Sequence, residues 1–239
     1  AECGKAVSKE TKVDILVTPL VTILSGVALS ALAAPAIGTA ARSVGDFLEW
    51  ATIQQPFFMG ILVSATVGVA LTLPISSAAI CAGIGLSGLA GGAAVAGCCA
   101  QMVGFAVMSF RENRWGGIVS QGLGTSMLQM GNIVRNPRIW IPATLASAIT
   151  GPIATCLFRL EMNGAPVSSG MGTCGMVGPI GVYAGWVNDV ATGAKAAITG
   201  YDWLAMALLC IVLPAVLSWA IGIPCRKLGW IKDGDLKLD

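Results

Sequence analysis

The residues of this chain best suited to chemistry are polar side chains set within long, glycine-rich apolar tracts. Amides, hydroxyls and carboxylates offer the hydrogen-bond donors and acceptors that the hydroxyl groups of a sugar-like molecule require. In apolar surroundings the same residues are at least as often used for hydrogen bonds between helices. The pattern predicts a binding site for a small polar solute, with these candidate residues: Glu161, Asn163, Ser168, Thr173, Gln101, Gln129 and Asn132.

Glu161 stands out among these candidates, because it separates a clean apolar tract from the most glycine-rich loop of the chain. An ionisable group costs on the order of 2.5 to 3.5 kcal/mol when it enters a bilayer, so each one needs a reason. The other such groups are Asp14, Arg159 and Asp189. Arg159 and Glu161 are also placed to form a purely structural ion pair at the end of a helix, and the sequence leaves this alternative open.

Chemistry that depends on histidine, paired thiols or a phosphate loop has no support in the sequence. The chain has no histidine and no Cys-x-x-Cys pair, and most of its eight cysteines lie inside apolar tracts, where cysteine acts as a small buried residue. No nucleophile stands beside a base, and no P-loop sequence is present. We therefore predict no catalysis by this chain, no metal site and no cofactor.

Composition identifies an integral membrane protein. Hydrophobic residues make up 55% of the 239 residues and charged residues only 11%, against about 25% charged in a typical soluble domain. The longest uncharged tract runs from Trp50 to Phe110, and a helical crossing needs about 20 apolar residues. The net charge of +2 is small and scattered, which excludes a nucleic-acid partner. We predict an all-α integral membrane protein, a polytopic helical bundle whose first partner is the lipid bilayer.

The apolar tracts predict the crossing helices. A first span from Ile15 to Ala34 ends at Pro35, and later spans cover 57–73, 139–158 and 203–223, with another that ends at Phe110. Residues 36–55 separate apolar from charged residues, as an interfacial amphipathic helix does. Residues 78–99 are rich in Gly, Ala and Ser, which fits either close helix packing or a broken, re-entrant element.

Two further stretches are too polar and too rich in glycine to be plain spans. Residues 115–136 mix glycines with Gln, Asn and Thr, and residues 161–185 are dense in Gly, Pro and hydroxyl groups. Irregular backbone at membrane depth needs protein or water to satisfy its polar groups. We predict that both stretches are re-entrant elements facing the protein interior.

The basic residues favour one orientation, because cytoplasmic loops carry an excess of Lys and Arg. If residues 50–110 cross three times and residues 115–134 are re-entrant, eleven of the fourteen basic residues lie on one side of the membrane. If the long tract crosses twice and residues 115–134 cross once, the split is nine to five. We prefer the first arrangement, with the more basic side in the cytoplasm.

Four stretches of the sequence resemble one bacterial family. They are residues 7–19, residues 73–79 (Leu-Pro-Ile-Ser-Ser-Ala-Ala), residues 97–113 and residues 124–129 (Gly-Thr-Ser-Met-Leu-Gln). On these motifs the chain resembles the IIC-type membrane proteins of the sugar phosphotransferase system, in the toxin-regulator branch named after a regulator of perfringolysin. The similarity covers nearly the whole chain.

The resemblance implies an architecture and a set of partners. It implies a single transmembrane IIC-like domain over residues 1–239, in a homodimer in the bacterial inner membrane, with a sugar site between the re-entrant hairpins and the spans. It also implies that two or three N-terminal spans found in such proteins are missing before the Lys9 to Lys12 region. Any phosphorylation would be carried out by separate cytoplasmic phosphotransferase subunits.

One feature departs from the wider family, whose well-studied sugar permeases place a histidine and a glutamate near the hydroxyl that is phosphorylated. This chain has no histidine, and Glu161, the candidate for the glutamate, lies in Arg159-Leu-Glu-Met-Asn-Gly164 without the usual glutamate-proline pattern. Two functions remain open. One is a permease that binds and translocates a small polar, sugar-like solute, with or without phosphorylation. The other is a membrane-embedded solute sensor or regulator without net transport.

The first prediction concerns the oligomeric state. The small residues between Ser87 and Gly97 allow close helix packing, and together with the resemblance they predict a homodimer in the membrane. Mass measurement or cross-linking in mild detergent should therefore give two copies of the chain. A protein that is strictly monomeric at all concentrations would contradict this prediction.

Overall fold

The computed structural model describes residues 14–238, apart from several side chains in the first part of helix α2 (Asp14–Gln54). The chain divides into two compact units, Ala1–Ser43 and Val44–Asp239. Residues 14–238 contain helices and turns but no β-strand, only one isolated bridge between Gly88 and Met162. The prediction of an all-α membrane protein is confirmed.

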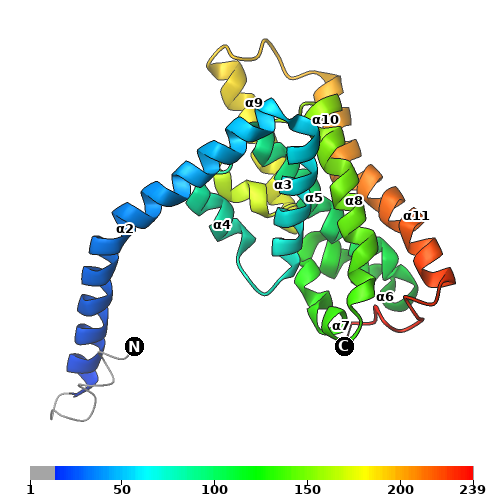
Figure 1. The fold of residues 1–239 in the computed structure, drawn as a ribbon, viewed down its shortest axis with the longest axis horizontal. Helices are drawn as coiled ribbons and strands as arrows, with labels where there is room; N and C mark the ends of the chain where they lie inside the picture. Colours follow the sequence, from blue (N-terminus) through cyan, green and yellow to red (C-terminus); the bar gives the residue numbers. More distant parts are fainter. Residues whose placement is uncertain (1–13, 239) are drawn as a thin grey trace. The chain divides into compact units, whose positions relative to one another are not determined.

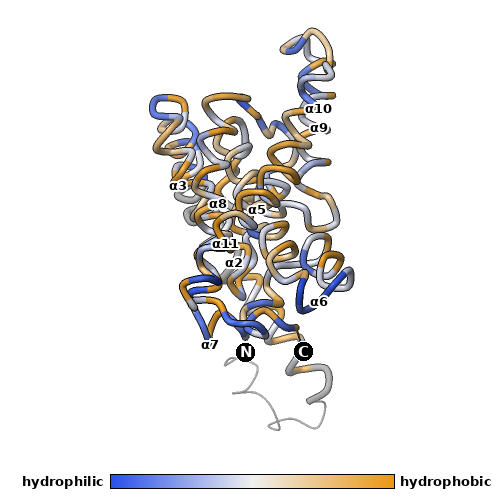
Figure 2. Tube along the Cα trace, turned by 90° about the vertical axis from the view of Figure 1, so that its right-hand side faces the viewer, coloured by the Kyte–Doolittle hydropathy of each residue, from blue (hydrophilic) through white to orange (hydrophobic). Residues whose placement is uncertain are grey.

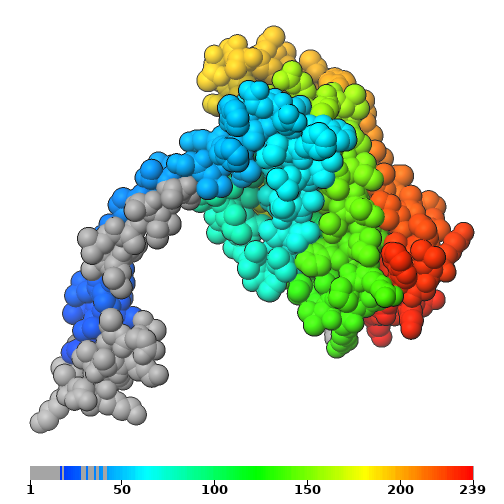
Figure 3. Space-filling view, viewed as in Figure 1, coloured from blue at the N-terminus to red at the C-terminus, as the bar shows by residue number. Residues whose placement is uncertain are grey.

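Four helical segments form the core of the second unit. Helix α5 (Gly88–Met108) lies at its centre and packs against α3 (Pro56–Thr72), α8 (Ile141–Pro152) and α11 (Leu213–Lys227) (Figure 1). On one face of the molecule, α8 lies between α3 and α11 (Figure 3). Three segments are long and apolar enough to cross a membrane: Gly88–Met108, Pro137–Leu157 and Gly200–Lys227, the last of which includes α10 (Gly200–Ala207) and η7 (Leu208–Val212).

Helix α5 is buried because its small residues let neighbouring backbones approach. A side chain at Gly97 would overlap the backbone of Ser64 in α3, and one at Gly104 would meet Ser218 in α11. Small residues are what brings transmembrane helices this close. Residues 87–97 were predicted to form the contact between two copies of the chain. In the structure this face packs against other helices of the same chain, so it is not available as a dimer surface.

The chain reverses its direction twice between Pro56 and Met108. Gly68 of α3 lies against Gly97 of α5, and Thr72 Oγ1 lies 3.4 Å from Gln101 Oε1, so α3 and α5 run in the same direction. The connection between them must then return through the same layer. It does so through α4 (Ser77–Ile84), which ends at Gly85 with a left-handed backbone (φ 69°), and through the residues up to Gly88. Residues 78–99 thus combine both predicted features, a break and close packing.

Helix α2 differs from the prediction at Pro35. The helix continues through this residue to Gln54 instead of ending there, and membrane helices do tolerate an interior proline. Residues 44–54 belong to the second unit. There Glu49 accepts hydrogen bonds from the Leu89 and Ala90 backbone N–H groups at 3.2 and 3.1 Å, and so satisfies free donors at the start of α5.

The second predicted re-entrant stretch is shorter than expected. Irregular backbone with two short turns, η5 (Pro166–Gly170) and η6 (Cys174–Met176), ends at helix α9 (Val177–Ala191). The glycines of α9 that were predicted as loop face this segment: a side chain at Gly181 would overlap Ser168, and one at Gly185 would meet the Asn163 backbone. These glycines allow α9 to pack closely against the preceding irregular segment, and they do not mark a flexible loop.

Residues 110–140 form a chain of short helices, none long enough to cross. They are α6 (Phe110–Gly117), η1 (Ile118–Gly124), η2 (Ser126–Gln129), α7 (Met130–Arg135) and η3 (Pro137–Trp140). Since α5 ends where they begin and α8 starts where they end, these helices stay at one end of the bundle. That end and the loop between α9 and α10 carry hydrophilic residues, with a mostly hydrophobic layer between them (Figure 2).

The cations of the second unit are divided unequally between the two ends. The end with α6 and α7, called here the tail end, carries Arg111, Arg114, Arg135, Arg138, Arg226, Lys227, Lys232 and Lys237, whereas the opposite end carries Arg159 and Lys195. Arg111 and Arg114 thus lie at the same end as Arg135 and Arg138, whereas the number of crossings within residues 50–110 stays a prediction. The predicted contribution of Lys5, Lys9 and Lys12 lies outside the described residues.

The positive-inside rule then predicts that the tail end lies in the cytoplasm. Gly116 and Ala196 are exposed at opposite ends of the bundle, so each can be replaced by cysteine in a protein whose Cys3 and Cys156 are serine. A membrane-impermeant maleimide added to intact cells should label Ala196→Cys, and Gly116→Cys only after the membrane is opened. Labelling of Gly116→Cys in intact cells would overturn this orientation.

Candidate functional site

A polar pocket of about 340 Å³ opens at the end opposite the tail, between the segment after α8 and helices α9 and α10. Arg159, Glu161, Asn163, Asp189 and Lys195 contribute to its wall. Two of the residues predicted for a solute site, Glu161 and Asn163, therefore lie together, and Asp189, the neighbouring carboxylate noted in the sequence, lies with them.

Asn163 links the two carboxylates of the pocket. Its Nδ2 group donates hydrogen bonds to Glu161 Oε2 at 3.3 Å and to Asp189 Oδ2 at 2.9 Å. Both amide hydrogens are used in this way, which leaves the other oxygens of the carboxylates as acceptors. The arrangement presents two acceptor groups a short distance apart, with one amide fixing their separation.

A cation and an indole ring also line the pocket. Lys195 Nζ pairs with Asp202 Oδ1 at 2.6 Å and lies 5.2 Å from the centroid of the Trp186 ring. Asp202 is itself held by Thr199, whose N–H and hydroxyl group both donate to Oδ2 at 2.8 Å in a capping box at the start of α10. Lys195 is thus fixed between a carboxylate and an aromatic face.

Arg159 lines the same pocket without pairing with Glu161. Its backbone is left-handed (φ 47°), and no ion pair within 4.0 Å joins it to an acidic group among residues 14–238. The structural ion pair considered as an alternative on the sequence is therefore wrong for this conformation. Glu161 is exposed and meets Asn163 instead.

The segment that carries Glu161 is fixed by backbone contacts to α5. Gly88 and Met162 exchange two backbone hydrogen bonds at 3.0 and 2.9 Å. Gly92 lies so close to the Leu160 carbonyl group that a side chain there would overlap the oxygen. The position of the pocket wall is therefore set by two glycines at the start of α5.

Ser168 and Thr173 lie deeper in the protein than the pocket. Ser168 packs against Gly181, one helical turn along α9 from Gly185, which contacts Asn163. Thr173 is 2% exposed, and within the described part of the chain its hydroxyl group has no hydrogen-bond partner. Neither residue is part of the pocket wall in this conformation.

Gln101 is the centre of a separate buried network. Its Nε2 group donates to Thr144 Oγ1 at 3.2 Å and to Ser147 Oγ at 3.4 Å, while its Oε1 accepts from Trp140 Nε1 at 3.0 Å. The Thr72 hydroxyl group also reaches Oε1 at 3.4 Å. All four hydrogen-bonding positions of the amide are used, so Gln101 joins α3, α5 and α8 as an interhelical link.

Gln129 and Asn132 bind the C-terminal segment of the chain. Gln129 Nε2 donates to the Leu236 carbonyl group at 2.9 Å, and Asn132 Nδ2 donates to the Lys237 carbonyl group at 2.8 Å. Asn113 donates to the same Leu236 carbonyl group at 2.7 Å. The structure therefore separates these two residues from Glu161 by the full depth of the bundle.

Three members of the pocket were missed on the sequence: Trp186, Lys195 and Asp202. The signal for Asp202 was present, since Thr199-Gly-Tyr-Asp202 has the spacing of a capping box. Lys195 and Trp186 gave no local signal, because only the folding of α10 back against α9 brings them to the pocket. The side chain of Asp14, another ionisable candidate, lies outside the described set.

Comparison with known proteins identifies one family. The model of the family described as "Phosphotransferase system, EIIC" matches residues 1–238. No curated protein and no solved structure matches the chain significantly.

The glycine contacts of α5 predict a specific stability effect. In Gly92→Ala the new methyl group must displace the Leu160 carbonyl, so we expect a loss of about 1–3 kcal/mol in the free energy of unfolding. Gly131→Ala is the matched control, since a side chain at Gly131 would meet nothing within 4 Å. Thermal denaturation in detergent measures both, and equal melting temperatures would refute the close contact.

Proposed function

Because the chain belongs to the phosphotransferase system EIIC family, a family of sugar-transport membrane components, we propose that the pocket beside Glu161 is its solute-binding site. The solute is small, polar and sugar-like, and the chain binds and translocates it. The observation that carries the proposal is the pair of carboxylates, Glu161 and Asp189, held by one amide beside an aromatic ring.

The chemistry of the pocket supports a polyhydroxylated ligand. Free carboxylate oxygens accept hydrogen bonds from solute hydroxyl groups, and Arg159 and Lys195 donate to solute oxygens. Trp186, which is 4% exposed and lies beneath Lys195, adds a small apolar part to the wall. The volume of about 340 Å³ lies near the lower end of the roughly 300–1,000 Å³ of small-molecule sites. These properties favour a single sugar-like unit over a longer chain.

The position of the pocket supports a role in uptake. It lies at the end of the bundle opposite the tail, which the positive-inside rule places outside the cytoplasm. A permease must receive its solute there before the carrier rearranges. Ser168 and Thr173 lie deeper in the protein than the pocket and are 6% and 2% exposed. Among the described residues the Thr173 hydroxyl group has no hydrogen-bond partner, and we propose that these two residues meet the solute in a later conformation.

The finer assignments rest on the resemblance. We propose that the chain belongs to the toxin-regulator branch, on the motifs of 73–79, 97–113 and 124–129, and that it forms a homodimer of one IIC-like domain in the bacterial inner membrane. On the same resemblance, any phosphorylation of the solute would be carried out by separate cytoplasmic phosphotransferase subunits.

The carboxylates generate the test of this function. Glu161→Gln and Asp189→Asn keep the shape of each side chain and remove its charge. We expect each to weaken solute binding about tenfold, because a hydrogen bond to a charged group contributes about 1.5–3 kcal/mol. Binding of a panel of radiolabelled hexoses, pentoses and hexitols to purified protein measures the effect. Asp46→Asn is the control, because Asp46 is exposed and distant in the sequence from Glu161 and Asp189.

The melting temperature separates binding from folding. Glu161 is exposed and has no ion pair among the described residues, so Glu161→Gln should melt within about 1–2 degrees of the parent protein. Unchanged binding in stable Glu161→Gln and Asp189→Asn proteins would remove the pocket from the solute path. Binding without uptake into proteoliposomes would instead identify a solute sensor, the alternative function.

A further inference from the structure

A second cavity lies at the tail end, on the outer surface of the bundle between the ends of α5 and α11. This groove measures about 580 Å³ and is lined mainly by apolar side chains, among them Val107, Phe110, Ile118 and Ile223. Gly104 faces Ser218 and Gly222 faces Met108, so the two helices run in the same direction and end together. The groove therefore opens where two membrane-crossing segments reach the membrane surface.

Two tryptophans mark that surface. Trp115 and Trp219 both line the groove and are 72% and 58% exposed. Phe110 packs edge-on against Trp115, with ring centroids 5.5 Å apart. Indole rings concentrate at the boundary between hydrocarbon and headgroups. The apolar part of the groove is therefore at the depth of acyl chains, and its open end is at the depth of lipid phosphates.

A basic basin of about 440 Å³ adjoins the groove and shares Arg111 and Arg226 with it. Lys227 and Lys232 also line the basin. Its acidic member, Asp233, is bound to Arg226 Nη1 at 3.0 Å.

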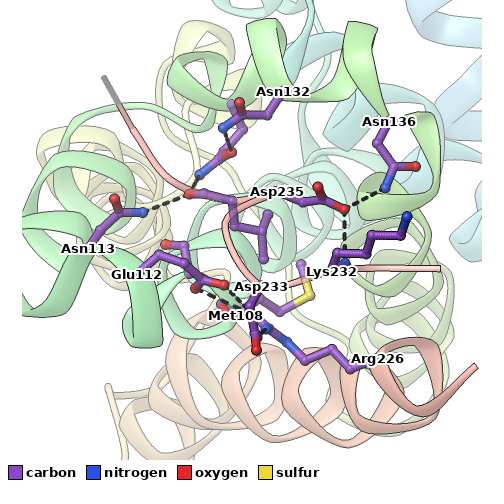
Figure 4. Close-up of polar contacts among 12 residues, drawn as sticks. Met108, Glu112, Asn113, Asn132, Asn136, Arg226, Lys232, Asp233 and Asp235 are labelled. Atoms are coloured by element: carbon purple, nitrogen blue, oxygen red, sulfur yellow. Dashed lines mark hydrogen bonds and ion pairs between the residues drawn. The ribbon is translucent and has the colours of Figure 1, made fainter. Parts of the chain in front are cut away.

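Arg226 is already neutralised, but Arg111 is not. Arg226 Nη2 also pairs with Glu112 Oε1 at 3.0 Å and binds the Met108 carbonyl group (Figure 4). No acidic group lies within 4.0 Å of Arg111, Lys227 or Lys232 among residues 14–238. The basin therefore holds unpaired positive charge beside an apolar groove.

We propose that this groove and basin bind one anionic glycerophospholipid, with an acyl chain along the groove and the phosphate group at Arg111. The combination is specific in its chemistry. A soluble phosphate has no apolar chain to fill the groove, and a lipid without net charge gains little from the unpaired cations of the basin. Basic pockets between transmembrane helices on the cytoplasmic side are a recognised setting for anionic lipid headgroups. This site is independent of the polar pocket near Glu161.

The bound lipid would stabilise the C-terminal segment that follows α11. The basin is built from the end of α11 and from the segment 229–233 that follows it, and the same segment continues into the residues that Asn113 and Gln129 bind. A phosphate at Arg111 adds an electrostatic contact between α6 and this segment. Lipid binding should therefore raise the stability of the folded protein.

The test compares ligands that carry one or both features. Purified protein in a mild nonionic detergent is titrated with phosphatidylglycerol, phosphatidylcholine or glycerol 3-phosphate, and the melting temperature is followed. We expect a saturable rise of several degrees with phosphatidylglycerol, a much smaller one with phosphatidylcholine and none with glycerol 3-phosphate. Equal rises with the two lipids would overturn the role of the basin. An equal rise with glycerol 3-phosphate would overturn the role of the groove.

Two variants separate this site from general charge attraction. Arg111→Gln should weaken the apparent affinity for phosphatidylglycerol about five- to tenfold, whereas Arg135→Gln, at an exposed arginine of the same end outside the groove, should not. The same loss in both variants would overturn the proposal.

Gly222→Leu tests the groove itself. The first carbon of a side chain at Gly222 meets Met108 at 3.5 Å, an ordinary contact, so the remaining atoms can extend into the groove. The variant should stay folded and lose the saturable response. Native mass spectrometry then counts retained phosphatidylglycerol directly, and retention unchanged by Gly222→Leu would contradict the site. A dimer that this variant converts to a monomer would assign the groove to a second copy of the chain instead.

Discussion

The close approach between the backbone of α5 and the irregular segment before α9 holds this structure in register. Gly92 lies on the Leu160 carbonyl group, and Gly88 pairs with Met162 through two backbone hydrogen bonds. Only glycine allows both contacts, because Gly88 has a left-handed backbone (φ 59°) and Gly92 has no room for a side chain. Glu49 completes this junction by capping the first N–H groups of α5. The pocket wall that carries Glu161 depends on all of these contacts.

A membrane bundle that breaks its helices must satisfy the freed polar groups from within. This chain does so with neutral side chains placed at the breaks. Ser77 binds the Gly170 carbonyl group at 2.7 Å, and Ser169 binds that of Leu86 at 2.7 Å, which joins α4 and its following turn to η5. Gln101 does the same between three long helices. Such residues look identical in the sequence to residues that would bind a solute, and only their geometry distinguishes the two roles.

That ambiguity explains which parts of the site could be predicted. Glu161 and Asn163, which line one pocket, could be singled out in the sequence because a carboxylate beside a glycine-rich segment is costly in a membrane. Gln101 and Gln129 carry no such signal, and their hydrogen bonds with Thr144 and the Leu236 carbonyl group are set by tertiary contacts. The long helices followed from hydropathy alone. The passage of α2 through Pro35 did not, since a proline ends or only bends a helix depending on neighbours that the sequence does not reveal.

The two ends of the bundle differ in which charged groups remain unpaired. At the pocket end, Glu161 and Asp189 share one amide and Lys195 pairs with Asp202, so carboxylate oxygens remain as acceptors beside Arg159. At the tail end, Arg226 forms ion pairs with both Glu112 and Asp233, and the charged groups that remain unpaired are cations. The ion pairs and hydrogen bonds within each end therefore increase the difference in charge between the two ends. A neutral solute that offers hydroxyl protons suits the first end, and a phosphate-bearing surface suits the second. The same asymmetry on which the predicted orientation rests thus also underlies the two proposed ligand chemistries.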